Sequence, residues 1–229
     1  VSLVGQLQLI LGRGVWFENA GHFQFLGDNT IGRSGSDMFF VNRGVMNKFS
    51  GSGTTRVNVP GVNRGTIIAL SGVIEFTNEF SNKGNVALAG GTVQWNGGLE
   101  IPEGGELTGS GKISGNAENS GTIKVNDKEG LININGNLVN KPNSSIFQQI
   151  ESVVVIAKYD NPADWPGNPS LSTVVDIEPQ IDVSGTATLA GTLEVTYDSQ
   201  GQAAEGDFIP VLVANSMVGN FDLVLGPRT

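Results

Sequence analysis

The acidic residues that lie closest together in the regular part of this sequence are Glu100, Glu103 and Glu106. Glycoside hydrolysis needs two carboxylates about 5–10 Å apart across a groove. These three surround Pro102 and Gly104, which are typical turn residues, so the pattern favours a solvated corner over a catalytic pair. The sequence therefore predicts no catalytic residue, and a polysaccharide lyase or hydrolase is kept as the alternative.

Metal and histidine chemistry has few candidates. His22 is the single histidine and there is no cysteine, so neither a histidine triad nor a thiolate metal site can be assembled. His22 follows Gly21 at a repeated turn, where we expect it to face solvent. Asp160 and Asp164 could offer oxygens to calcium, but they lack the alternating Asp-x-Asp-x-Asp-Gly order of a calcium loop. We expect no cofactor, with calcium as the alternative.

Two aromatic residues flank those acids, and together the four form a candidate binding loop: Tyr159, Asp160, Asp164 and Trp165. The aromatic rings could stack on a sugar or could anchor the loop to the protein. Four of the nine prolines fall between residues 160 and 180. This composition predicts an inserted loop, whose removal should leave the rest of the fold intact.

An internal repeat organises the chain that must position these residues. A short motif of the form Asn-x-Gly, with Pro102 in place of Asn in one copy, starts at residues 19, 42, 63, 82, 102 and 119. A second series of glycines, out of phase with the first, occupies positions 51, 72, 91, 111 and 130. Two series with one period of about 20 residues indicate a structural repeat.

Each repeat holds short β-branched, apolar segments such as 66–70 and 73–76, which are typical of strands. Gly and Asn separate them, and both tolerate the left-handed backbone of a sharp corner. About 20 residues suffice for one circuit of two or three strands, and stacked circuits would place the asparagines in a hydrogen-bonded column. We predict an all-β parallel β-helix, because a β-propeller blade needs about 40 residues.

The domain organisation follows from where the repeat is interrupted. We predict β-helix coils over residues 1–145, an apolar strand with the Pro-rich loop over 146–180, and closing coils of the same solenoid over 181–229. In the last segment Leu189, Leu193 and Val195 fit inward positions.

Charge limits the partners. The net charge of −9 argues against nucleic acid, and no apolar stretch is long enough to span a membrane. Residues 1–99 carry seven basic and five acidic residues, whereas residues 100–229 carry six and seventeen. The two ends therefore differ in sign, which favours head-to-tail self-association.

The segment Asp182–Val195, followed by Gly206-Asp207-Phe208 and Gly219-Asn220-Phe221, resembles the C-terminal coils of autotransporter-type passenger domains and similar secreted bacterial β-helix proteins. The Asn-x-Gly-Thr-Ile copies are similar to that class as well. The Pro-rich segment at 160–180 departs from the pattern. The resemblance implies export to the extracellular space or cell surface. It also implies a role as adhesin, fibre or scaffold, with cell-surface polysaccharide as a further partner.

Two apolar segments could join neighbouring subunits by strand addition. They are the alternating strand with Leu7, Leu9 and Leu11, and the continuous run that includes Val153, Val154 and Val155. The chain starts Val-Ser-Leu, which suggests a processed chain or a fragment of a larger protein. We expect a non-enzymatic extracellular structural protein, a β-helical rod that serves as filament subunit or adhesin stalk.

Overall fold

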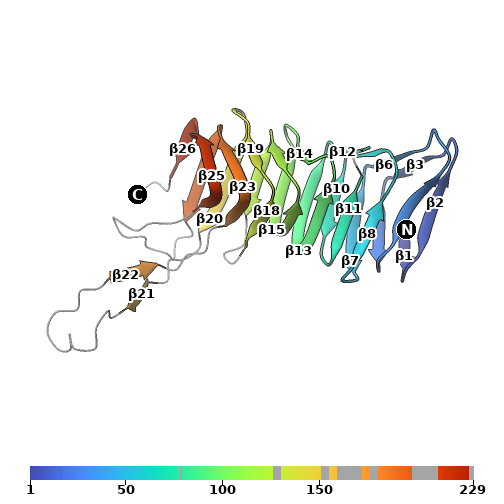
Figure 1. Cartoon of the computed structure of the whole chain (residues 1–229), viewed down its shortest axis with the longest axis horizontal. Helices are drawn as coiled ribbons and strands as arrows, with labels where there is room; N and C mark the ends of the chain where they lie inside the picture. Colours follow the sequence, from blue (N-terminus) through green and yellow to red (C-terminus); the bar gives the residue numbers. More distant parts are fainter. Residues whose placement is uncertain are drawn as a thin grey trace.

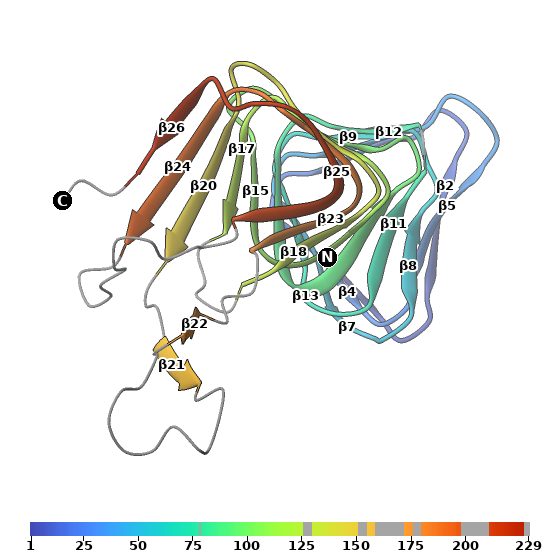
Figure 2. The ribbon, with the colours of Figure 1, turned by 60° about the vertical axis from the view of Figure 1, so that its left-hand side comes forward.

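The computed structural model describes residues 1–77, 79–125, 130–150, 155–158, 172–175, 180–197 and 211–226. Within these ranges the chain forms strands and turns and no helix. The strands wind into an elongated solenoid, with the first strands at one end and the last at the other (Figure 1). A rotated view shows the strands arranged as walls around a common interior (Figure 2).

Three walls of parallel strands make up each coil. The first wall contains β1 (Ser2–Val4), β4 (His22–Leu26), β7 (Val45–Ser50), β10 (Thr66–Ala69), the start of β13 (Asn85–Trp95), the start of β15 (Glu106–Ser114), β17 (Thr122–Val125), β20 (Ser145–Ile150), β24 (Thr192–Tyr197) and β26 (Leu223–Leu225). The second wall contains β2 (Gln8–Gly12), β5 (Thr30–Ser34), β8 (Thr54–Val57), β11 (Val73–Phe76), the ends of β13 and β15, β18 (Ile132–Asn135), and the starts of β23 (Ile181–Leu189) and β25 (Leu212–Gly219).

The third wall has two parts. The first part contains β3 (Trp16–Asn19), β6 (Phe39–Asn42), β9 (Gly61–Asn63) and β12 (Phe80–Asn82). The second contains β14 (Leu99–Ile101), β16 (Ala117–Asn119), β19 (Leu138–Asn140) and the ends of β23 and β25.

The strand register gives the length of a coil. In the first wall, His22 pairs with Val45, Val45 with Thr66 and Thr66 with Asn85, which are offsets of 23, 21 and 19 residues. The predicted all-β parallel β-helix with about 20 residues per coil is therefore confirmed. The inward positions predicted in the last coils are confirmed too, since Leu193 is buried and Leu189 and Val195 pack against the core.

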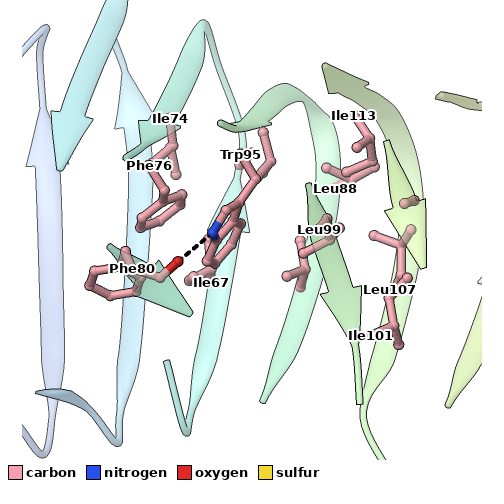
Figure 3. Packing of buried hydrophobic residues seen from close by; sticks show 14 of the residues in the cluster. Ile67, Ile74, Phe76, Phe80, Leu88, Trp95, Leu99, Ile101, Leu107 and Ile113 are labelled. Carbon is pink, nitrogen blue, oxygen red and sulfur yellow. Dashed lines mark hydrogen bonds between the residues drawn. The ribbon is translucent and has the colours of Figure 1, made fainter. Parts of the chain in front are cut away.

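The interior is one apolar column that changes composition along the axis. Its early coils are filled by aromatic rings, and Phe76 stacks on Trp95 with ring centroids 4.3 Å apart. The indole N–H of Trp95 donates to the carbonyl of Phe80, which satisfies the polar atom of a buried ring (Figure 3). Beyond Trp95 the core is built mainly from Ile, Leu and Val, because the inward positions there carry aliphatic residues.

The recurring asparagines form the predicted column. Asn19, Asn42, Asn63 and Asn82 end successive strands of the third wall, and each amide donates 2.7 Å to the carbonyl oxygen of the next side chain. A second ladder runs from Asn119 to Asn140, also at 2.7 Å. Between them Asn82 donates instead to the backbone carbonyl of Glu100. All six side chains are buried, so the ladder supplies hydrogen bonds that water cannot.

The glycine of the Asn-x-Gly motif has a different role from the one predicted. Neither Gly44, Gly65 nor Gly84 adopts a positive φ, and none of the column asparagines does. The backbone carbonyl of the preceding coil instead occupies the space of a side chain: that of Gly44 lies against Gly65, and that of Gly65 against Gly84. The column is glycine because the coils approach closely there, and the expectation of a left-handed corner at these positions was wrong.

The repeat frame around Pro102 also needs correction. The structure pairs Ile101, not Pro102, with Asn119, and the carbonyl of Ile101 accepts the N–H of Ser120. The glycine that stacks in the column is Gly105, which lies against Gly121. This corner is thus two residues longer than the Asn-x-Gly corners, and Ile101 is the residue that interrupts the asparagine ladder.

The boundary of the insertion differs from the prediction as well. Residues 145–150 form β20, which pairs with β17 and β24 in the first wall, so the coil continues to Ile150 instead of ending at 145. Gln180 also belongs to the coil, because its carbonyl accepts the N–H of Ile132. Inside the insertion, β21 (Val155–Lys158) pairs antiparallel with β22 (Ser172–Val175) as a sheet of its own.

Candidate functional site

Most residues of the predicted binding loop lie outside the described part of the chain. Tyr159, Asp160, Asp164 and Trp165 fall there, as do Val153 and Val154 of the second predicted assembly strand. Val155 lies in β21 and pairs with Val175. In the first predicted assembly strand, Leu9 and Leu11 belong to β2 and contribute to the core, whereas Leu7 precedes the strand and is exposed.

The three clustered acids are separated by the fold. Glu100 lies in β14, Glu103 in the following turn and Glu106 at the start of β15, and all three are exposed. Glu103 and Glu106 fit the solvated corner that the sequence predicts. His22 is exposed at the start of β4, as expected. Glu100, in contrast, meets an acid that the sequence did not associate with it.

That acid is Glu118, which pairs with Glu100 on the neighbouring strand β16. Both side chains project from the outer face of the third wall, since the residues before and after each are buried. Neighbouring parallel strands are about 4.8 Å apart, so the two carboxylates stem from adjacent positions. Like charges placed directly opposite each other destabilise a sheet. Conflicts of this kind, which do not serve the fold, are typical of functional sites.

The two carboxylates border a groove of about 390 Å³. The groove runs over the outward residues of β14, β16 and β19 and over the turns before these strands. Its polar side chains are Glu100, Glu118, Asn116 and Asn137, and Leu99 and Val139 add apolar surface. Acceptors, donors and an apolar strip therefore converge in one hollow, as in small-molecule binding sites.

Lysines hold both acids from outside the groove. The ammonium of Lys83 donates to both carboxylate oxygens of Glu100, at 2.9 and 2.8 Å. Lys141 lies 3.2 Å from one oxygen of Glu118. These pairs are about half exposed, so each adds little stability. They do orient the carboxylates and balance the two negative charges with two positive ones.

Backbone contacts orient the asparagines. The side-chain oxygen of Asn116 accepts the N–H of Asn137, at 3.0 Å, and that of Asn137 accepts the N–H of Thr186, at 2.8 Å. With each oxygen engaged by the next coil, the amide NH₂ groups remain as donors on the exposed face. Gly98, at the start of the groove, has a φ of +86°, a conformation that favours glycine.

A sequence signal for this groove existed in the repeat. Once Ile101 is aligned with Asn119, Glu100 and Glu118 occupy the same repeat position, one residue before the end of the strand. Placing Pro102 in that column shifts the frame by one residue, and the match disappears. The paired acids were missed for this reason.

A second polar cluster lies inside the solenoid. Lys48 of β7 points inward with its side chain fully buried, and its ammonium donates to three oxygens: the carbonyl of Gly27 at 3.0 Å, the carboxylate of Asp28 at 2.8 Å and the hydroxyl of Thr55 at 3.1 Å. The Asp28 carboxylate also accepts the N–H of Gly53. All three donors of the lysine are thus satisfied, which a buried ammonium requires.

The Asp28 carboxyl has a pKa below its ordinary value of 3.8. The hydrogen bond from Lys48 is the main cause, with smaller contributions from the lysine's charge and the N–H of Gly53. Burial acts in the opposite direction and is outweighed. The cluster joins the corners of two successive coils, so it serves the fold.

Two classes of feature were searched for in the described residues. No group of three or more His, Cys, Asp or Glu side chains there is arranged to hold a metal ion. Those residues also contain no helix with the length and apolar character needed to cross a membrane.

Comparison with known proteins leaves the groove and the ladder as the informative features. We found no family model, no curated protein and no solved structure that matches this chain, so its function has to be inferred from its own residues.

Proposed function

We propose that this protein is a non-enzymatic extracellular structural protein, a β-helical rod that acts as a surface fibre, filament subunit or adhesin stalk. The observation that carries the proposal is the buried asparagine ladder, which links coil to coil by side-chain hydrogen bonds along the axis. A scaffold needs stiffness along its length, and buried, satisfied polar networks give a structure rigidity.

Ion pairs between coils support the same role. Arg56 and Glu75 occupy paired positions on β8 and β11 and lie 3.0 Å apart. Arg43 and Glu18 connect consecutive coils of the third wall at 3.3 Å, and Lys83–Glu100 and Lys141–Glu118 do so further along. Each pair is weak alone, but all of them join neighbouring coils and resist sliding between them.

Head-to-tail self-association is part of this proposal. Apolar side chains are exposed on strands at both ends of the rod, including Val4 and Trp16 at one end and Val218 and Val224 at the other. The opposite charge balance of the two halves of the sequence would favour unlike ends meeting. A head-to-tail contact that does not close into a ring makes a filament.

Electron microscopy and sedimentation velocity of the purified protein test the structural role. We expect rods whose length grows with protein concentration, and shorter species when Leu7 and Leu9 are both replaced by Lys. A wild-type protein that remains monomeric at every concentration would exclude the filament.

The non-enzymatic part is tested separately with a panel of acidic and neutral polysaccharides. We expect neither new reducing ends nor unsaturated products. Turnover of any polysaccharide that is lost in Glu100→Gln or Glu118→Gln would replace the structural proposal with a carbohydrate-active enzyme.

A further inference from the structure

The groove over β14, β16 and β19 has a lining that the structural role does not explain. A rod gains nothing from two acids placed opposite each other, because the pair opposes strand association. Two lysines then have to be supplied from neighbouring coils to balance them. We propose that this groove binds a neutral oligosaccharide chain laid along the axis of the rod.

The acceptor capacity of the groove fits hydroxyl groups. An ionised carboxylate accepts about four hydrogen bonds. Lys83 takes one on each oxygen of Glu100, and Lys141 contacts one oxygen of Glu118. Both carboxylates therefore keep free acceptor positions while their orientation is fixed. A carboxylate in this state can accept from two neighbouring hydroxyls of a sugar.

The donors complete the match. Asn116 and Asn137 have their side-chain oxygens engaged by backbone N–H groups, so their NH₂ groups are directed to a ligand. A sugar hydroxyl both donates and accepts, and it needs donors beside acceptors. The alternation of Glu and Asn around a strip formed by Leu99 and Val139 provides this arrangement.

Charge excludes the competing ligands. Each carboxylate already has an ammonium within 3.2 Å, which opposes a divalent cation at the same oxygens. An acidic sugar would meet two carboxylates in the groove, whereas the lysines lie outside its lining. A neutral chain avoids both conflicts.

The extent of the groove indicates a chain. It covers three consecutive strands of the third wall, so its ends are about 10 Å apart at the usual strand spacing. This is longer than one sugar ring and follows the rod axis.

Isothermal titration calorimetry with cellohexaose, xylohexaose, mannohexaose and maltohexaose tests the proposal. We expect at least one of the four to bind with one site per chain. Glu100→Gln and Glu118→Gln should each weaken that affinity about tenfold, because each removes hydrogen bonds to a charged acceptor. Val139→Arg should abolish binding by filling the groove.

Glu75→Gln is the matched control, since it removes an outward, ion-paired carboxylate from the second wall, away from the groove. We expect it to bind like the wild type, and circular dichroism should show all four variants folded. Absence of binding to every neutral hexasaccharide would overturn the proposal. So would binding of oligogalacturonate or calcium instead, or affinity unchanged in both groove variants. None of these results bears on rod formation, which electron microscopy reports independently.

Discussion

At the scale of single residues, the buried lysine is the most consequential departure from an apolar core. Lys48 occupies an inward position in register with Phe25 and Ala69. Replacing it with Ala should lower the free energy of unfolding by about 3 kcal/mol, because Asp28 loses its ionic partner and a cavity opens. Urea denaturation measures this loss. A change below about 1 kcal/mol would show that the cluster contributes no more than a surface pair.

The same cluster predicts a pH dependence. Because the folded pKa of Asp28 lies below 3.8, the unfolded state binds its proton first as the pH falls. The stability from this carboxylate is present above the unfolded pKa and is lost as the pH falls through the folded pKa. Asp28→Asn should therefore be less stable than wild type at pH 7, and the gap should narrow below pH 3.8. Urea denaturation across this range measures it, and a gap that stays constant would contradict the prediction.

The asparagine ladder allows a comparison between two buried residues. Asn63 accepts from Asn42 and donates to Asn82, whereas Asn119 begins its ladder and has a side-chain partner only in Asn140. Asn63→Ala leaves two buried amides short of a partner and should cost about 3 kcal/mol. Asn119→Ala should cost less, because it deprives one. Equal losses in chemical denaturation would show that the ladder adds nothing beyond each side chain's own backbone contacts.

At the scale of elements, the glycine column sets how closely the corners stack. A methyl group at Gly65 would run into the carbonyl of Gly44, a backbone atom that cannot move without shifting a coil. Gly65→Ala should therefore destabilise the protein by about 3 kcal/mol. Gly21 occupies the same motif but has open space around it and no positive φ, so Gly21→Ala should be close to neutral. Thermal or urea denaturation of both variants tests this, and similar losses would contradict the close-approach explanation.

At the scale of the whole molecule, the insertion enters the solenoid at a corner that other coils cross quickly. It connects β20 in the first wall to β23 in the second, and residues 70–72 alone make the same connection between β10 and β11. Replacing residues 151–179 with a short Gly-Ser linker should preserve the β-sheet circular dichroism spectrum and a cooperative unfolding transition. Gln180 has to be retained, because it bonds to Ile132 and to Gln149. Loss of the spectrum would place the insertion in the core.

The sequence by itself determined the fold class, the coil length and the asparagine column. In a solenoid each coil contacts only its neighbours, so one residue type recurring at one period in the chain becomes a column in space. The inward direction of Lys48 was also accessible, because strand alternation places it on the same side as the buried Met46.

Only the tertiary structure decided which residues meet across coils. The corners differ in length, and the two extra residues around Pro102 shift every later position relative to the earlier coils. The pairing of Glu100 with Glu118 depends on that offset, as does the groove they border. Strand pairing, which depends on how the backbone hydrogen bonds align, fixes the offset, and no local pattern of residues records it.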